Sequence, residues 1–411
     1  MTIGGEMEYL YKIYYKNKDK YESVYKSRIN NEVVEKISLP YKIKQKTPIS
    51  LYFLPSIKTM AMVEAIKKND KILMFLARGF KEKYKDYLFI DLIANDLEAS
   101  NLLEGIESNK DEIIYSTKKI LEEKKPNDKR FGRALNSYRL LLDNKLNPPK
   151  TNEDIRTIYD NITSGEIEKD NLPDGKFYRK GPVYIQRAGS VSGQVIHQGV
   201  SGEDEIAYNM ECMMDFMEES NLPSLIKIAI SHYYFAYTHP FYDGNGRVGR
   251  FLSAIYLKKD YSYLTALSLS KGSLIERTTY YKAFDKTNDP ISKGELNFFV
   301  DSFLELIIKG QESILEFFNK STENLIEDFE KFENKLKDMD GLDLNLVDIF
   351  LMNKYFARNQ AIERNDIILD LEKEGWPVSK IKARLDYYRE IFLIKAVKKR
   401  PLMYILNEEF V

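Results

Sequence analysis

Residues 238–250, THPFYDGNGRVGR, place a histidine, a carboxylate, two arginines and three glycines in one short stretch. The glycines match the G-x-G-x-x-G spacing of dinucleotide-binding loops, which requires a strand before the first glycine and a βαβ unit around it. Here Pro-Phe-Tyr-Asp precedes the first glycine, and no alternation of strands and helices follows. The sequence also lacks the G-x-x-x-x-G-K-[ST] pattern of a P-loop. The glycines therefore indicate neither of these nucleotide folds.

The same stretch could bind an anion at the start of a helix. A loop with Gly244 and Gly246 exposes backbone N–H groups there, and the amides and the helix dipole favour negative charge. Arg247 and Arg250 are three residues apart, so on a helix they would share a face and bring two guanidinium groups to one anion. This pattern predicts a phosphate site.

Two further residues would turn a phosphate site into a transferase site. Asp243 directly precedes the glycines, where a carboxylate could hold a Mg2+ ion that bridges phosphate oxygens. His239 would end the preceding helix, and its imidazole could accept a proton from an attacking hydroxyl near neutral pH. Together these groups predict phosphoryl or nucleotidyl transfer. We expect the other histidines to take no part, His232 as a hydrogen-bonded core residue and His197 as an exposed one.

Helices predominate among the elements that must position these residues. Apolar periodicity predicts helices over 90–104, 111–124, 130–145 and 152–162, and a buried helix that runs from Pro223 to Thr238. Residues 176–200 differ, because β-branched and aromatic residues flank a Gly/Ser-rich centre at 188–193, which predicts a hairpin. Ser201 and Asp204 predict an approximate capping box for the next helix. We expect a mainly α fold with domains at 1–110, 111–336 and 341–411.

The C-terminal segment, residues 341–411, has a distinct order of predicted helices and strands. Helices near 344–356, 362–373 and 378–389 precede two short strands, FLIKAV and LMYIL, and this is the order of a winged-helix module. The third helix would then be a recognition helix that faces DNA. The residues predicted to face DNA phosphates are Lys380, Lys382, Arg384, Lys398, Lys399 and Arg400. An equally open alternative is a solvated basic face on a docking module.

Composition limits which binding partners and which cellular compartment are expected for the protein. The chain has 411 residues with 62 Lys+Arg against 63 Asp+Glu, so no global charge favours nucleic acid or an anionic membrane. The N-terminus has no apolar signal region, and no run of about 18 apolar residues occurs. The single cysteine, Cys212, cannot form a disulfide framework within one chain and is expected in the core. We expect a soluble cytoplasmic protein with no membrane contact.

The motif around His239 resembles that of a known family. His239-Pro240-Phe241, Gly244-Asn245-Gly246-Arg247 and Arg250 match HPFxxGNGRxxR, the signature of the Fic (filamentation induced by cAMP) family, at every defining position. The resemblance extends with decreasing specificity over roughly 90–330. It implies a Fic-type helical core in which the hairpin at 176–200 is the flap that aligns a target segment by strand addition. A homodimer is an expectation at the level of the family.

The resemblance implies transfer of AMP from ATP to a Ser, Thr or Tyr hydroxyl of a target protein, which could be the chain itself. The roles carried over are His239 as base, Phe241 as anchor of the loop, Asp243 as ligand of Mg2+ or Mn2+, Gly244, Asn245 and Gly246 as phosphate cradle, Arg247 for the β-phosphate and Arg250 for the γ-phosphate.

A second motif resembles the family's inhibitory helix. Ser100-x-x-x-Glu104-Gly105 matches (S/T)xxxE(G/N), although serine and glutamate four apart before a C-cap glycine also describe many ordinary helices. The resemblance implies that Glu104 pairs with Arg250 and occupies the γ-phosphate position, so that the enzyme is autoinhibited. Removal of AMP by the same glutamate, alone or alongside transfer, is one alternative. A DNA-binding regulator whose nucleotide site only senses ATP is another.

Overall fold

The computed structural model describes residues 7–80, 82–123, 131–186, 195–356 and 358–410, and it is mainly helical, as predicted. Its contacts divide the chain into two units. Unit 1 comprises Met1–Phe75 with Ile93–Ile314, and unit 2 comprises Leu76–Leu92 with Leu315–Val411. The boundaries fall within three helices, α3 (Ile57–Arg78), α4 (Glu82–Leu103) and α14 (Asn297–Leu336). The predicted domain boundaries remain predictions.

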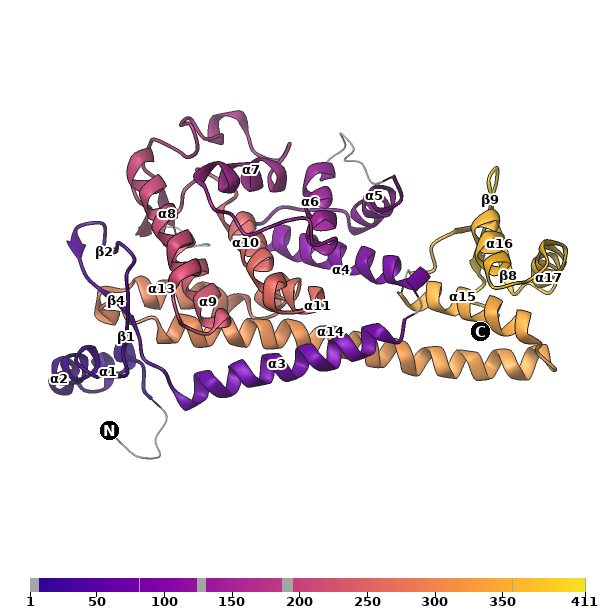
Figure 1. Cartoon of the computed structure of the whole chain (residues 1–411), viewed down its shortest axis with the longest axis horizontal. Coiled ribbons are helices and arrows are strands. Elements are labelled where there is room, and N and C mark those ends of the chain that lie inside the picture. The colour runs from indigo at the N-terminus through magenta and orange to yellow at the C-terminus, as the bar shows by residue number, and fades with distance from the viewer. Residues whose placement is uncertain (1–6, 81, 124–130, 187–194, 357, 411) are drawn as a thin grey trace. The chain divides into compact units, whose positions relative to one another are not determined.

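The centre of unit 1 is α9 (Ser224–Thr238), which packs against α8 (Glu203–Glu219) and α10 (Asn245–Asp260) (Figure 1). Nearly every side chain of α9 is buried, which is typical of a helix that is apolar around its whole circumference. Next to α10 lies α7 (Asn152–Ile162). It begins with a complete capping box between Thr151 and Asp154, which explains why this predicted helix has the bounds expected from the sequence.

Further helices of unit 1 surround this centre. They are α5 (Lys110–Glu123), α6 (Gly132–Leu142), α11 (Tyr263–Ala266), α12 (Leu269–Ile275) and α13 (Arg277–Asn288). Cys212 on α8 is half-buried rather than a core residue, because its position lies between the buried and solvent faces of that helix. Within the described part of the chain, no helix has the length and apolar composition needed to cross a membrane.

The N-terminal residues complete the core of unit 1. They form α1 (Leu10–Lys16), α2 (Lys18–Ile29) and the short strands β1 (Glu35–Ile37), β2 (Lys42–Ile43), β3 (Thr47–Pro48) and β4 (Leu51–Phe53). Buried Glu295 accepts hydrogen bonds from the backbone N–H of Leu10 and from Arg28. The hydroxyl of Tyr234 on α9 donates to the carbonyl of Pro40 over 2.7 Å, and the N–H of Lys42 donates to the hydroxyl of Tyr237 over 2.9 Å. The segment therefore covers α9 directly.

A two-stranded hairpin of β5 (Tyr184–Gln186) and β6 (Val195–Gln198) lies where a hairpin was predicted. Its predicted Gly/Ser-rich centre at 188–193 falls outside the described residues. The capping box predicted at Ser201 is wrong. The next helix, α8, begins at Glu203 after Gly202, which takes a φ of 90° and gives no side-chain cap. The Glu203 carboxylate instead accepts the backbone N–H of Phe177 over 2.6 Å.

Unit 2 contains the predicted order of three helices and two strands at its C-terminal end. These elements are α15 (Gly341–Phe356), α16 (Arg364–Lys373), α17 (Val378–Glu390), β8 (Ile394–Lys399) and β9 (Leu402–Leu406). A short strand, β7 (Ile362–Glu363), precedes α16 and pairs with β9, so the sheet order is β7-β9-β8. Leu346, Phe350, Leu385 and Tyr404 are among its fully buried core residues. Assignment as a winged helix remains a prediction.

Candidate active site

The loop between α9 and α10 is held in a fixed shape by its own residues. His239 ends α9 in the left-handed region with φ 51°, and Gly244 precedes α10 with φ 81°. The Asn245 amide accepts the N–H of Phe241 over 3.0 Å and donates to its carbonyl over 2.8 Å. Phe241 is fully buried and stacks on Tyr159 with ring centroids 3.9 Å apart, which confirms it as the anchor of the loop. These contacts present the N-terminus of α10 to the space beside His239.

A buried guanidinium group fastens this loop to the hairpin. Arg179 is fully buried, and its Nε donates to the His239 carbonyl over 2.8 Å. Its Nη1 donates to Gly181 O, and its Nη2 donates to Val200 O and Thr238 O, at 2.5, 2.7 and 3.3 Å. Gly181 and Val200 flank the two strands of the hairpin, whereas Thr238 and His239 end α9. Arg179 therefore fixes the backbone of His239 relative to the hairpin.

The His239 ring is neutral at physiological pH in this arrangement. It is half-buried, with Nδ1 3.3 Å from the carbonyl oxygen of Ala236. Burial, together with the smaller effects of the nearby His197 ring and Arg179 guanidinium, lowers the pKa of His239 to about 3. The imidazole therefore holds a nitrogen lone pair that can accept a proton.

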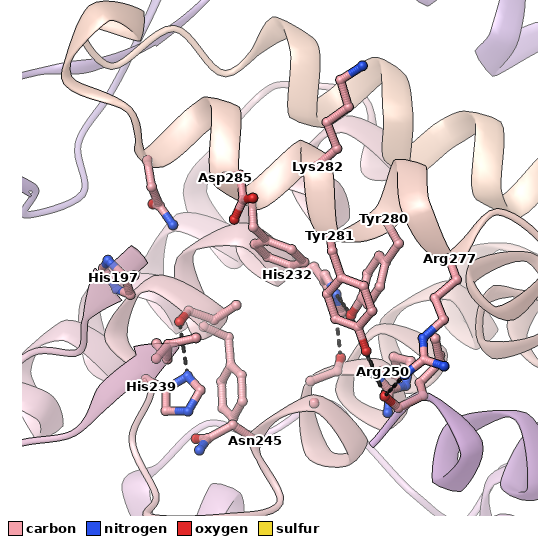
Figure 2. Close-up of a pocket in the computed structure, with 18 of the residues that line it drawn as sticks. His197, His232, His239, Asn245, Arg250, Arg277, Tyr280, Tyr281, Lys282 and Asp285 are labelled. Atoms are coloured by element: carbon pink, nitrogen blue, oxygen red, sulfur yellow. Dashed lines mark hydrogen bonds between the residues drawn. The ribbon is translucent and has the colours of Figure 1, made fainter. Parts of the chain in front are cut away.

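A cavity of about 840 Å³ opens beside this loop (Figure 2). His239 and Asn245 line one side, and Arg250 and Tyr280 line the other (Figure 2). Gly246 also lines the cavity. Residues of α13, the end of α4 and the hairpin also line it, among them Leu103, Glu104, Gly105, Ile185, His197, Arg277, Thr278, Tyr281 and Lys282. The volume lies in the range that holds a cofactor-sized or nucleotide-sized ligand.

Arg250 is bound by the helix that carries the predicted inhibitory motif. Its Nη2 lies 2.8 Å from Glu104 Oε1 and also donates to the carbonyl of Ser100 over 2.8 Å, while its Nε donates to Ser100 Oγ over 3.1 Å. Tyr280 OH accepts from Nη1 at 3.4 Å. The side chain of Arg250 is only 1% exposed, whereas that of Glu104 is 28% exposed toward the cavity. The structure thus brings together all three predicted residues.

Glu104 also reaches the start of α10. A Cβ atom added to Gly246 would lie 2.0 Å from Glu104 Oε1, so the carboxylate rests directly against the backbone of the predicted phosphate cradle. The end of α4 sets this position. The N–H of Ile106 donates to Asn101 O and that of Gly105 to Leu102 O, with Gly105 at φ 75°, which is a Schellman cap. A carboxylate therefore occupies the place where the helix N-terminus would receive an anion.

Arg247 faces a different carboxylate. Its Nη1 lies 2.7 Å from Glu166 Oε2, and both side chains are almost fully buried. Its Nε and Nη2 are buried and have no hydrogen-bond partner among the described residues. Arg247 does not line the cavity described above, so the anion that it was predicted to share with Arg250 remains a prediction. The N–H groups on these two nitrogens therefore lack an acceptor that a ligand could supply.

The chain matches the model of the Fic/DOC family over residues 149–257. This segment is a Fic/DOC domain. A Fic family protein from Desulfovibrio desulfuricans G20 is similar in structure, with a TM-score of 0.52 and 16% identity over 90% of this chain and 98% of that chain. A Fic domain containing signaling protein from Bacteroides thetaiotaomicron VPI-5482 gives 0.38 and 18% over 60% and 97%, and Fic-1 from C. elegans gives 0.36 and 15% over 65% and 73%. The first likeness shows a shared fold.

Asp243 of the Fic motif suits a Mg2+ ion that is also bound by substrate phosphates. It is exposed, and its Oδ1 accepts the N–H of Gly244 over 2.5 Å. The described residues contain no cluster of three or more His, Cys, Asp or Glu side chains that could hold a metal. Mg2+ commonly uses one or two carboxylates, waters and substrate phosphates, and a single carboxylate beside an anion site suits that mode.

The predictions for the two other histidines of the Fic domain had different outcomes. His232 is buried, with Nδ1 2.9 Å from Ser253 Oγ and Nε2 3.0 Å from Tyr280 OH, so its prediction as a satisfied core residue is confirmed. His197 was expected to be exposed, which is wrong. It is half-buried, and its Nε2 lies 2.7 Å from the carbonyl oxygen of Tyr237, because β6 packs over the end of α9.

Two residues that contact the Fic domain site, Arg179 and Glu166, were not identified from the sequence. Arg179 and Glu166 contact residues about 60 and 81 positions away, and no local spacing signals such pairs. Tyr281 donates its hydroxyl to the carbonyl of Leu103 over 2.6 Å and so joins α13 to the end of α4. Arg179 stands beside Lys180 in a mixed stretch, so its charge alone did not distinguish it.

Proposed function

We propose that the chain is a protein adenylyltransferase, which transfers AMP from ATP to a hydroxyl side chain of a target protein. The observation that carries this proposal is that a neutral imidazole and a buried guanidinium line one cavity on either side of a helix N-terminus. His239 supplies the first group and Arg250 the second, and Gly246 in the first turn of α10 lines the same cavity. This spacing suits a polyphosphate whose α-phosphorus faces His239.

The reaction balances with these groups. The target hydroxyl oxygen attacks the α-phosphorus, its proton passes to His239, and the bond between the α-phosphorus and the bridging oxygen breaks to release pyrophosphate. The backbone N–H groups of Asn245 and Gly246, two residues that line the cavity, would stabilise the charge that develops on the α-phosphoryl oxygens. Asp243 would hold the Mg2+ ion, which supplies neutralisation of phosphate charge when bound. Arg250 lines the cavity and would hold the outer phosphates, whereas Arg247, paired with Glu166, does not line it.

The position of Glu104 supports an autoinhibited enzyme. Its carboxylate pairs with Arg250 and lies against Gly246, so a γ-phosphate would have to displace it. Two negative groups cannot share one guanidinium at this distance without strong repulsion. ATP would then bind only in a pose that leaves the α-phosphate misaligned. Removal of AMP from a modified protein is the second candidate, because the same exposed carboxylate borders the cavity and could orient a water.

Labelling experiments with two isotopic positions test the proposal. When Glu104→Gly is incubated with Mg2+ and a cell extract, we expect protein-bound label from ATP carrying 32P at the α-position, and no label from the γ-position above that of the extract alone. The double variant Glu104→Gly/His239→Ala should give no label. Label from the γ-position would indicate a kinase and overturn the proposal. Release of AMP from a pre-labelled target by the wild type, with no labelling by Glu104→Gly, would favour removal.

A further inference from the structure

A group of exposed cations in unit 2 has no role in the proposed transfer. Lys380 and Lys382 lie in the first half of α17, and Lys398, Lys399 and Arg400 lie at the turn between β8 and β9; we call these residues the basic face. All are exposed. None forms an ion pair or a side-chain hydrogen bond with a residue that the structure describes. Their charge is therefore not neutralised within the described fold.

Three acidic groups of unit 2, Asp340, Asp343 and Asp386, are already paired with arginines. Asp340 and Asp343 bind Arg384, with an N–O distance of 3.0 Å for Asp340. Arg384, predicted to face phosphates, is therefore committed to carboxylates inside unit 2. Asp386 lies 3.2 Å from Arg364. Residues 376–400 contain eight basic and two acidic side chains, so the surface keeps a strong positive field although the whole chain is nearly neutral.

The shape of α17 also fits a groove. Ile381, Leu385 and Tyr388 pack into the core of unit 2, and at about 3.6 residues per turn Ser379 and Ala383 lie on the opposite, exposed side. Lys380 and Lys382 flank this strip of small side chains, one on each edge. A helix about 10–12 Å wide fits a B-DNA major groove about 12 Å wide, and small residues at its centre allow close approach to base edges.

We infer that unit 2 binds duplex DNA, with the first half of α17 in the major groove and the β8–β9 turn against the phosphate backbone. Lys380 and Lys382 then contact phosphates on the two strands that border the groove, and Lys398, Lys399 and Arg400 contact the adjacent backbone. B-form DNA is favoured over duplex RNA because the major groove of A-form RNA is too narrow for a helix. The inference does not depend on AMP transfer.

Salt dependence measures the number of phosphate contacts directly. The full chain is titrated against a fluorescein-labelled DNA duplex of mixed sequence from 50 to 200 mM NaCl, without ATP, and anisotropy gives the affinity. Five phosphate contacts predict a slope of log K against log salt of about −4.5, which is a loss of roughly 500-fold over this range. Lys398→Ala/Lys399→Ala/Arg400→Ala should reduce the slope to about −1.8, a loss of roughly 12-fold.

The matched control is Lys36→Ala/Lys44→Ala/Lys46→Ala, which removes the same charge from exposed positions at the N-terminal strands of unit 1. We expect its slope to equal that of the wild type. Unchanged circular dichroism and melting temperature show that each variant is folded. The inference is overturned if no binding occurs at 50 mM NaCl, or if both triple variants lose slope equally. Equal or tighter binding of a duplex RNA of the same sequence would also refute it.

Discussion

Replacement of Glu104 should strengthen the binding of ATP by a predictable amount. In the structure the Glu104 carboxylate accepts a charge-assisted hydrogen bond from Arg250 Nη2 at 2.8 Å, and its side chain is 28% exposed. Such hydrogen bonds contribute about 1.5–3 kcal/mol, and partial exposure to solvent favours the lower part of that range. At about 2 kcal/mol, removal of the competing carboxylate raises the affinity for ATP roughly 30-fold.

Isothermal titration with Mg-ATP and with AMP checks this value. We use His239→Ala as the background, because a chain without the proposed base should bind nucleotide without turnover. Glu104→Gly should gain roughly 30-fold in affinity for ATP, whereas AMP, which has no γ-phosphate, should gain far less. Arg250 keeps its hydrogen bonds to Ser100 in this variant, so its position is preserved.

Glu98→Gln is the matched control for Glu104→Gly. Glu98 lies on the same helix, its side chain is 27% exposed, and it forms an ion pair with Lys110 at 3.0 Å, away from the cavity. The reasoning is refuted if Glu98→Gln raises the affinity for ATP as much as Glu104→Gly does. It is equally refuted if Glu104→Gly binds ATP and AMP with the affinities of the parent, because the carboxylate would then not compete with a phosphate.

Two further predictions concern the base and its support. Because the pKa of His239 is lowered to about 3, its imidazole stays neutral well below pH 6.5. The value of kcat/KM for AMP transfer by Glu104→Gly should therefore not fall between pH 8 and pH 5 at constant Mg2+. Initial rates that halve near pH 6.5 would contradict this prediction. Arg179→Met leaves several buried carbonyls without a hydrogen-bond donor, at about 1–3 kcal/mol each, so the free energy of unfolding measured in urea should drop by at least roughly 3 kcal/mol. Arg133→Met, at an exposed position, should change the free energy of unfolding little.

The proximity of the main site residues could be predicted from the sequence because these residues are close together along the chain. His239, Gly246 and Arg250 lie within one motif, and helix geometry fixes their relative positions once the flanking helices are recognised. The pairing of Glu104 with Arg250 spans 146 residues, and only the resemblance to a family motif predicted it. The contact between Arg247 and Glu166 has neither local spacing nor a recognised motif, so it could not be predicted.

Parts of the fold were less predictable for physical reasons. Two long helices, α3 and α4, precede the inhibitory motif's glycine, but lysines interrupt the apolar pattern of α3, and the sequence predicted only the helix over 90–104 in this region. Long lysine side chains can cover apolar surface with their methylene groups, which weakens the amphipathic signal. At the start of α8, Gly202 adopts a positive φ that moves the helix start beyond Ser201. Backbone conformation of this kind is not encoded in a capping pattern.

The hydrogen bonds that join the N-terminal residues to α9 bear on how this domain can be dissected. Residues 149–257 are what the family model recognises, yet Tyr234 and Tyr237 within them bond to Pro40 and Lys42. A fragment cut at the limits of the family match would expose these buried tyrosines and leave their hydroxyls without protein partners. The segment that the family model matches therefore lacks residues that pack directly on α9, and a fragment meant to keep these tyrosines bonded must include Pro40 and Lys42.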